Sequence, residues 1–415
     1  MSVINIISSI GNNSSPYPLL VRDCGIEGPF KIGLTYSQNL KDSKEAANNA
    51  FRERFIDEYG TSAVWLGGIP LFGKLCDWGI KKLGYNPNIN PKLFNENENS
   101  KQGMKINIKK FEKTAPKEVE EMKKALENRK VFEGLLAGKF AISTIIPIIL
   151  MGVAIPKLNF ALTDKINEKR KLKKQEEKAI EEKKETEGTN PSFKGLASTL
   201  ANTTTLEKMA VTDAGLTVGR VATGRNRNEK LELGFKMIMM MFLNFVAPFG
   251  IAKFFDTISG KLFGTNVDLD VKLLDNKEFL NAIKNNTLEM PEENIIEYLD
   301  KNPKSQFSKL ASQYCDVKYL DNGVRDPRCY VDEKKIKKFI NEIKKFSKDA
   351  LNNKNVDEFS KKAIKIKTFN ILANITVSSL LLAVGLPKLI FVLRKKVTGS
   401  DVEPGLVNIV HDEAA

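Results

Sequence analysis

The chain has 415 residues, with 65 lysines and arginines against 51 aspartates and glutamates, which gives a net charge of +14 at pH 7. It contains one histidine and four cysteines, whereas a structural zinc site needs about four convergent donors of these types. A Ser-His-Asp or Cys-His centre would have to use His411, close to the C-terminus. The sequence therefore predicts no catalytic residue, no metal site and no cofactor.

Residues 1–61 form a polar N-terminal region without the basic start and longer apolar core of a secretory signal. A twelve-residue apolar stretch follows at 62–73, and crossing a hydrocarbon layer takes about 17 to 25 residues. Its length favours a half-crossing, re-entrant or interfacial segment, and Gly67, Gly68 and Pro70 at its centre make it the best candidate for a hairpin.

Three longer apolar stretches occupy residues 140–156, 237–252 and 368–387. The last runs twenty residues without a charge and the first runs seventeen, so both reach the length of a transmembrane helix. Their apolar side chains surround the helix axis, whereas a core helix of a soluble protein usually keeps a polar face. We therefore expect a mainly α-helical, polytopic membrane protein. The alternative is a set of buried helices in a large soluble protein.

Two pairs of similar segments recur in the same order along the chain. VAIPKLNFALTDK at 153–165 and VGLPKLIFVLRKK at 384–396 agree at seven of thirteen positions, with a shift of 231 residues. GYNPNINPKLFNENE at 84–98 resembles GTNVDLDVKLLDNKE at 264–278, with a shift of 180. These ordered matches predict two tandem, duplicated helical units. An even number of crossings per unit would place the copies parallel.

The remaining segments of the chain differ from one another in their charged and apolar residues. Mixed acids and bases after residue 164 are typical of a solvated helix. Residues 332–351 place apolar side chains on one helical face, which favours packing within a small domain over binding to anionic lipid. The predicted segments are a polar N-terminal region (1–61), membrane unit 1 (62–165), a charged helical spacer with a Gly/Arg segment (166–229), membrane unit 2 (230–396) with a small helical domain inserted at about 270–360, and a flexible tail (397–415).

Each copy ends in a Pro-Lys-Leu-x-Phe-x-Leu motif. The proline kinks or ends the helix, the lysine can extend its ammonium group towards lipid headgroups, and the phenylalanine keeps the next turn at the interface. We interpret both motifs as membrane exits, with a substrate site at the two prolines as the alternative. Their residues are Pro156, Lys157 and Phe160 in the first copy and Pro387, Lys388 and Phe391 in the second.

Two further sets of polar residues lie in or beside the apolar stretches. Arg220, Arg225 and Arg227 alternate with glycines, and we expect them to contact anionic lipid headgroups. The alternative is a phosphate-binding loop, although no Walker pattern is present. We expect a second set of polar residues to form hydrogen bonds between helices, namely Asn244, Asn370 and Asn374.

The leading functional hypothesis is a non-catalytic structural or interaction component of a bacterial plasma membrane. Its partners would be the lipid bilayer and anionic headgroups, and the sequence indicates no particular protein partner. A small-solute transporter or channel built from two parallel repeats is one alternative, but the long apolar stretches contain no Asp, Glu or Arg. A soluble, basic, polyanion-binding protein is the other. Acids interleave with the bases and no reading motif occurs, so nucleic acid is not an expected partner.

The four cysteines indicate whether the chain folds in an oxidising or a reducing compartment. Only Cys315 and Cys329 lie near each other in the sequence, and a disulfide between them would need an oxidising environment. Because no other feature indicates secretion, we expect free thiols.

Overall fold

The computed structural model describes residues 2–12, 15–40, 44–94, 101–155, 157–159, 161–162, 165, 205–222, 227–264, 267–353 and 355–398. Across these ranges every regular element is a helix, and β pairing is limited to one bridge between Tyr319 and Arg325. The predicted mainly α-helical fold is confirmed. Most of the predicted spacer (166–204 and 223–226) and the predicted tail beyond residue 398, with His411, lie outside the described residues.

The chain forms two compact units, each assembled from three separate segments. Unit 1 comprises Met1–Pro18, Lys74–Lys139 and Pro248–Val377, and unit 2 comprises Leu19–Gly73, Phe140–Ala247 and Ser378–Ala415. Both units therefore contain residues from both predicted copies. The sequence-based division into 62–165 and 230–396 stays a prediction.

Unit 1 has its core where the small inserted domain was predicted. The amphipathic helix α18 begins after Asp332, whose carboxylate accepts hydrogen bonds from two backbone N–H groups of the first turn. Its apolar face, with Ile336 and Ile343, is fully buried in this core, so the predicted packing is confirmed. The helices of unit 1 are α1 (Val3–Gly11), η3 (Pro91–Phe94), α6 (Met104–Phe111), α7 (Pro116–Glu127), α13 (Ala247–Phe263), α14 (Val271–Leu274), α15 (Lys277–Lys284), α16 (Ile295–Lys301), α17 (Gln306–Tyr314), α18 (Glu333–Leu351) and parts of α5 (Ile69–Lys82), α8 (Arg129–Ile149) and α19 (Val356–Leu380).

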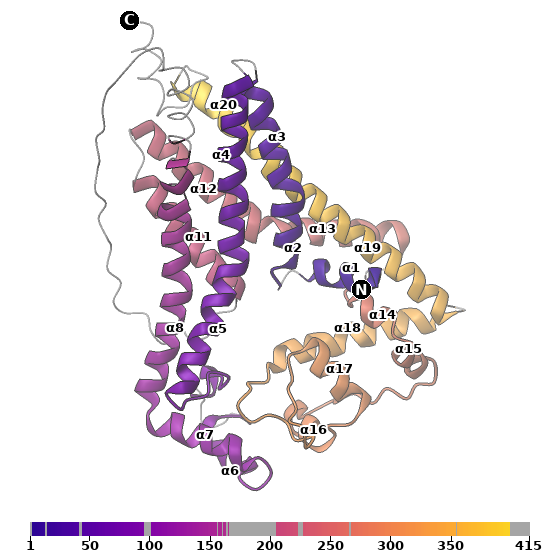
Figure 1. Cartoon of the computed structure of the whole chain (residues 1–415). Helices are drawn as coiled ribbons and strands as arrows, with labels where there is room; N and C mark the ends of the chain where they lie inside the picture. Colours follow the sequence, from indigo (N-terminus) through magenta and orange to yellow (C-terminus); the bar gives the residue numbers. More distant parts are fainter. Residues whose placement is uncertain are drawn as a thin grey trace, which may run out of the picture. The chain divides into compact units, whose positions relative to one another are not determined.

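Unit 2 is a bundle that contains two helical hairpins. In one, α3 and α4 lie side by side, and in the other α11 and α12 do (Figure 1). Gly215 lets α11 approach α8 closely, because a Cβ there would lie 2.6 Å from Cδ1 of Ile148. Besides the remainders of α5, α8 and α19, its helices are α2 (Tyr17–Leu20), η1 (Val21–Glu27), α3 (Gly28–Asn39), α4 (Lys44–Ala63), η2 (Val64–Gly68), η4 (Leu150–Ala154), α11 (Thr205–Ala222), α12 (Arg227–Phe245), η5 (Leu381–Gly385) and α20 (Leu386–Thr398).

The π-helical turns η1, η2 and η5 each end two residues before a proline, namely Pro29, Pro70 and Pro387. A proline ring clashes with the carbonyl four residues earlier in an α-helix and supplies no N–H. A wider π turn relieves this conflict, since the residue before each proline donates to the carbonyl five positions back. The chain stays helical from Lys44 to Lys82, so the hairpin expected at 62–73 is wrong.

Local features recur at the sequence shift of 180. Gly84 and Gly264 both adopt a left-handed backbone, with φ of 79° and 68°, where α5 and α13 have ended. A single helical turn follows each glycine at the same spacing, η3 in one case and α14 in the other. Within unit 2, the rings of Trp65 and Phe245, also 180 positions apart, pack edge to face with centroids 6.1 Å apart.

Equivalent features recur at the shift of 231 as well. The π turns η4 and η5 differ by this number of residues. In unit 1, Lys139 of α8 pairs with Asp77 of α5. The residue 231 positions after Lys139 is Asn370 of α19, which donates to Asp256 of α13 at 2.8 Å. Asp77 and Asp256 therefore each accept a hydrogen bond from a helix that leads into a π turn. These helices are α8 before η4 and α19 before η5.

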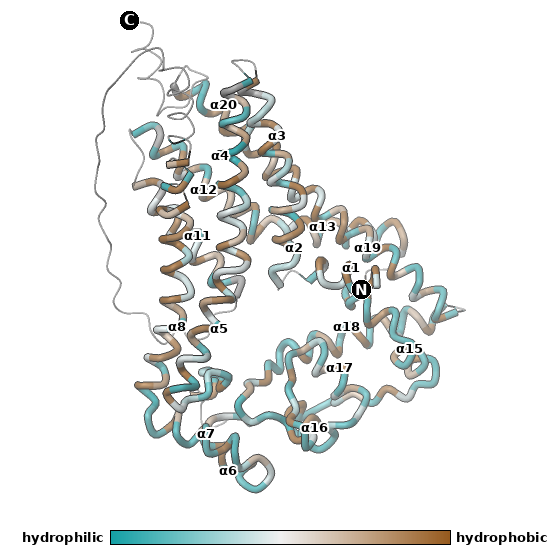
Figure 2. Tube along the Cα trace, viewed as in Figure 1, coloured by the Kyte–Doolittle hydropathy of each residue, from teal (hydrophilic) through white to brown (hydrophobic). Residues whose placement is uncertain are grey.

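Among the residues that the structure describes, two helical runs are long and apolar enough to cross a membrane: Arg129–Asn159 with 31 residues and Val356–Val397 with 42. A third candidate is the pair Lys230–Phe245 and Ala247–Phe263, which is bent by 42° at its break. Figure 2 shows hydrophobic residues along much of α8 and α19. Only 33% and 39% of the most apolar windows of these two runs are buried within the protein.

Candidate functional site

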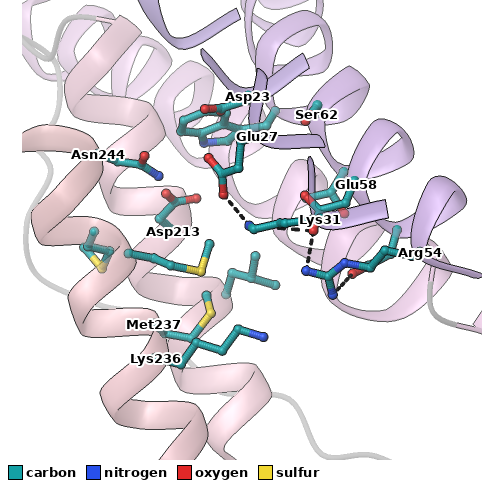
Figure 3. A pocket seen from close by; sticks show the side chains of 16 residues that line it. Asp23, Glu27, Lys31, Arg54, Glu58, Ser62, Asp213, Lys236, Met237 and Asn244 are labelled. Atoms are coloured by element: carbon teal, nitrogen blue, oxygen red, sulfur yellow. Dashed lines mark ion pairs between the residues drawn. The ribbon is translucent and has the colours of Figure 1, made fainter. Parts of the chain in front are cut away.

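A polar site lies in unit 2, where charged side chains from five helices line a cavity of about 100 Å³ (Figure 3). We call it the charged cavity. Residues from η1, α3 and α4 form one wall, and residues from α11 and α12 form the other. Its charged lining residues are Asp23, Glu27, Lys31, Arg54, Asp57, Glu58, Asp213 and Lys236.

A chain of ion pairs connects the helices of the first wall. The ammonium group of Lys31 contacts the Glu27 carboxylate one helical turn earlier, and it lies 3.7 Å from Oε1 of Glu58. Arg54 donates to the same oxygen of Glu58 at 2.6 Å, again at the four-residue spacing of a helix face. The Glu27 and Lys31 side chains are only 6% and 10% exposed. Removing Lys31 would thus leave the buried Glu27 carboxylate without its cation, whereas removing Glu27 would leave Lys31 with Glu58 as its partner.

Asp23 lies on η1 beside this chain of ion pairs. Its Oδ1 is 3.5 Å from Nε of Arg22, which in turn donates from Nη2 to the amide oxygen of Asn244 at 2.9 Å. Burial, together with repulsion from Glu27, raises the pKa of Asp23 from 3.8 to about 7. Burial opposes the charge of Lys31, but attraction to Glu27 and Glu58 outweighs it and raises the pKa of that lysine.

Apolar residues close the remainder of the cavity. Trp65 of η2 is buried against Phe245, and its Nε1 lies 3.5 Å from the backbone oxygen of Met209. Met237 and Met240 of α12 add flexible side chains to the lining. The apolar stretch predicted at 237–252 thus contributes directly to the cavity, and most of the charges there come from other helices.

The asparagines singled out in the sequence lie at helix contacts. Asn244 accepts the hydrogen bond from Arg22 and lines the charged cavity. In unit 1, Asn370 accepts from the Ser259 hydroxyl at 2.7 Å and donates to Asp256. Asn374 is buried.

The exit-motif residues within the described ranges lie on the surface. Lys157, Lys388 and Phe391 are exposed, as is Pro387. The remaining two, Pro156 and Phe160, lie outside the described residues.

The described part of the Gly/Arg segment is helical to Ala222. Within it, Gly215 belongs to a close helix contact, and the phosphate-loop alternative stays a prediction. Arg227 is exposed at the start of α12. Arg225 and the side chain of Arg220 lie outside the described residues.

Sequence reasoning missed the charged cavity because its residues come from segments far apart in the chain. One signal was available. Asp23, Glu27 and Lys31 are spaced by four residues, so they share a helix face in the predominantly uncharged segment 17–38. A buried ionic stripe on an amphipathic helix is the structure that this spacing favours.

The charged side chains of the cavity can bind ions and exchange protons. Its hydroxyl groups, Thr61 and Ser62, have no histidine beside them in the lining. Within the ranges that the structure describes, no group of three or more His, Cys, Asp or Glu residues is arranged to hold a metal ion.

Comparison with known proteins gives no match: no family model fits the chain, and no curated protein or solved structure is similar to it.

Proposed function

We propose that the chain is an integral membrane protein, a non-catalytic structural or interaction component of a bacterial plasma membrane. The outward face of α8 carries this proposal. Ile142, Ile145 and Ile149 are 45%, 47% and 52% exposed, and they lie at intervals that bring them to one side of the helix. Burying an isoleucine fully contributes about 1.5 to 3 kcal/mol, so a water-exposed stripe of this kind is unfavourable and lipid would cover it.

The bent pair of α12 and α13 supports the same proposal. Ile238, Phe242 and Phe249 are each about half exposed or more, with exposed fractions of 62%, 48% and 57%. Large apolar side chains exposed in this way on apolar helices favour a contact with lipid or another protein. The exposed Lys157, Lys388 and Arg227 would contact anionic headgroups at the ends of such helices.

We infer further that the membrane region arose by duplication of one helical unit. The paired left-handed glycines at the shift of 180 and the paired π turns at the shift of 231 support this inference. The contacts of Lys139 with Asp77 and of Asn370 with Asp256 are similar, with donors 231 residues apart and carboxylates 179 residues apart. Two related copies that pack together would bury a continuous interface that one copy alone lacks.

The experiment that tests membrane integration is alkaline extraction of the full chain from bacterial membranes. Integral proteins stay in the pellet after a carbonate wash, whereas peripheral proteins are released. We expect the chain in the washed pellet and its release only by detergent. Recovery in the carbonate supernatant would contradict the proposal.

A second candidate is a transporter or channel, and the charged cavity is the observation that favours it. Ionisable groups packed among apolar helices of membrane proteins commonly mark ion or substrate paths. The long apolar stretches contain no Asp, Glu or Arg, but the charges of this cavity lie outside those stretches, on η1, α3, α4, α11 and α12. Saturable solute uptake by liposomes that contain the purified chain would favour this candidate over the first.

A further inference from the structure

The charged cavity contains more acidic groups than basic ones. Five carboxylates line it, whereas three cationic side chains do. Arg22, next to Asp23, supplies a fourth positive charge. These named groups therefore carry one more negative charge than positive charges, and burial makes an unbalanced charge unfavourable. The carboxylates are Asp23, Glu27, Asp57, Glu58 and Asp213, and the lining cations are Lys31, Arg54 and Lys236.

The ion pairs distinguish Asp23 from Glu27, Asp57 and Glu58. Glu27 and Glu58 share Lys31, and Arg54 also binds Glu58 and lies 4.0 Å from Asp57. Asp23 has the weaker contact with a cation. Nε of Arg22 lies 3.5 Å from Oδ1 of Asp23, and this buried oxygen accepts no hydrogen bond.

We propose that the charged cavity is a binding site for a single proton, which Asp23 takes up from water as a neutral carboxylic acid. Binding forms one O–H bond on the Asp23 carboxylate and brings the cavity to charge balance; release restores the carboxylate and returns the proton to water. The groups that face Asp23 are Arg22 and Glu27 on η1, Lys31 on α3, Arg54, Asp57 and Glu58 on α4, Asp213 on α11 and Lys236 on α12.

Two properties of the site make the exchange reversible near neutral pH. Arg22 and Lys31 attract the carboxylate form, whereas burial and Glu27 favour the neutral form more strongly, which places the pKa of Asp23 at about 7. The cavity of about 100 Å³ also has room for a few water molecules, and these can carry the proton. Proton binding at Asp23 is a property of unit 2 beyond the proposed function, and it does not depend on whether the chain transports a solute.

The two tryptophans of the chain provide a direct readout. Trp65 lines the charged cavity, and Trp78 is 65% exposed in unit 1. Trp78→Phe in the full chain, purified in detergent, leaves Trp65 as the single emitter. We expect its fluorescence to titrate between pH 5 and 9 with a midpoint near 7 and the slope of a single proton.

Matched variants in the Trp78→Phe background make the test specific. Asp23→Asn mimics the protonated acid and should abolish the titration. Glu27→Gln should keep it but move the midpoint to lower pH, because the repulsion that favours protonation of Asp23 is removed. Asp316→Asn is the control, since its side chain is 83% exposed in unit 1, and it should titrate like the parent. A flat parent titration, or one unchanged by both Asp23→Asn and Glu27→Gln, would overturn the proposal.

Discussion

Replacing Ile145 by lysine distinguishes a lipid-facing α8 from a water-facing one. Ile145 is 47% exposed and lies near the middle of the apolar stretch 140–156. At the centre of a membrane helix isoleucine contributes about −0.5 kcal/mol to insertion and lysine costs about 3 kcal/mol. The difference of about 3.5 kcal/mol corresponds to a loss of about 300-fold in the ratio of inserted to uninserted helix. On a water-facing surface the same change would alter stability by about 0.5 kcal/mol or less.

The assay translates the full chain with microsomal membranes and an engineered glycosylation acceptor on either side of residues 140–156. In the parent chain we expect glycosylation of the acceptor on one side of the segment only. In Ile145→Lys the segment should fail to insert, so the two acceptors should show the same glycosylation state. Leu351→Lys is the matched control, because Leu351 is 51% exposed at the end of the amphipathic helix α18 and its replacement should leave the pattern unchanged. Identical patterns for the parent and both variants would refute the lipid-facing assignment of α8.

Two predictions concern unit 1. Phe279 is fully buried and stacks on Phe346 with ring centroids 6.1 Å apart, so Phe279→Ala should lower the free energy of unfolding by about 3 to 5 kcal/mol in denaturant titrations; a loss below about 1 kcal/mol would contradict the assigned core. Burial raises the pKa of the Cys315 thiol from 9.0 to about 12, so its alkylation at pH 8 should be at least tenfold slower than that of a small thiol. The folded chain favours the neutral thiol of Cys315, so this thiol contributes to the free energy of unfolding below about pH 9, and the contribution is lost as the pH rises towards 12. Rapid alkylation of Cys315 in the folded chain would refute the raised pKa.

Several parts of the fold follow from the sequence because they depend on local periodicity. The stripe on residues 332–351 predicts which face of α18 is buried, and the structure confirms it at Ile336 and Ile343. The π turns could not be predicted in this way. Glycine and proline at 67–70 suit a hairpin or a helix that widens by one residue, and only the packing around η2 decides between them.

The candidate site was harder to predict, since tertiary contacts define it. Asn244 was singled out as an interhelical residue, but its partner Arg22 lies 222 positions away. Gly215 resembled part of a flexible loop, whereas close packing against Ile148 fixes it in a helix. A charge in a polar segment of the sequence looks solvated until the chain folds it against apolar helices, as happens to Asp23.

Depth-dependent quenching by brominated lipid tests the central claim, that lipid covers the apolar helices. The full chain with Trp65→Phe and Trp78→Phe would carry one new tryptophan, either Ile145→Trp or Leu351→Trp, in lipid bilayers. We predict strong quenching at position 145 by lipids brominated deep in the acyl chain and little quenching at position 351. Equally weak quenching at both positions, with the folded chain recovered in the aqueous phase, would contradict the account.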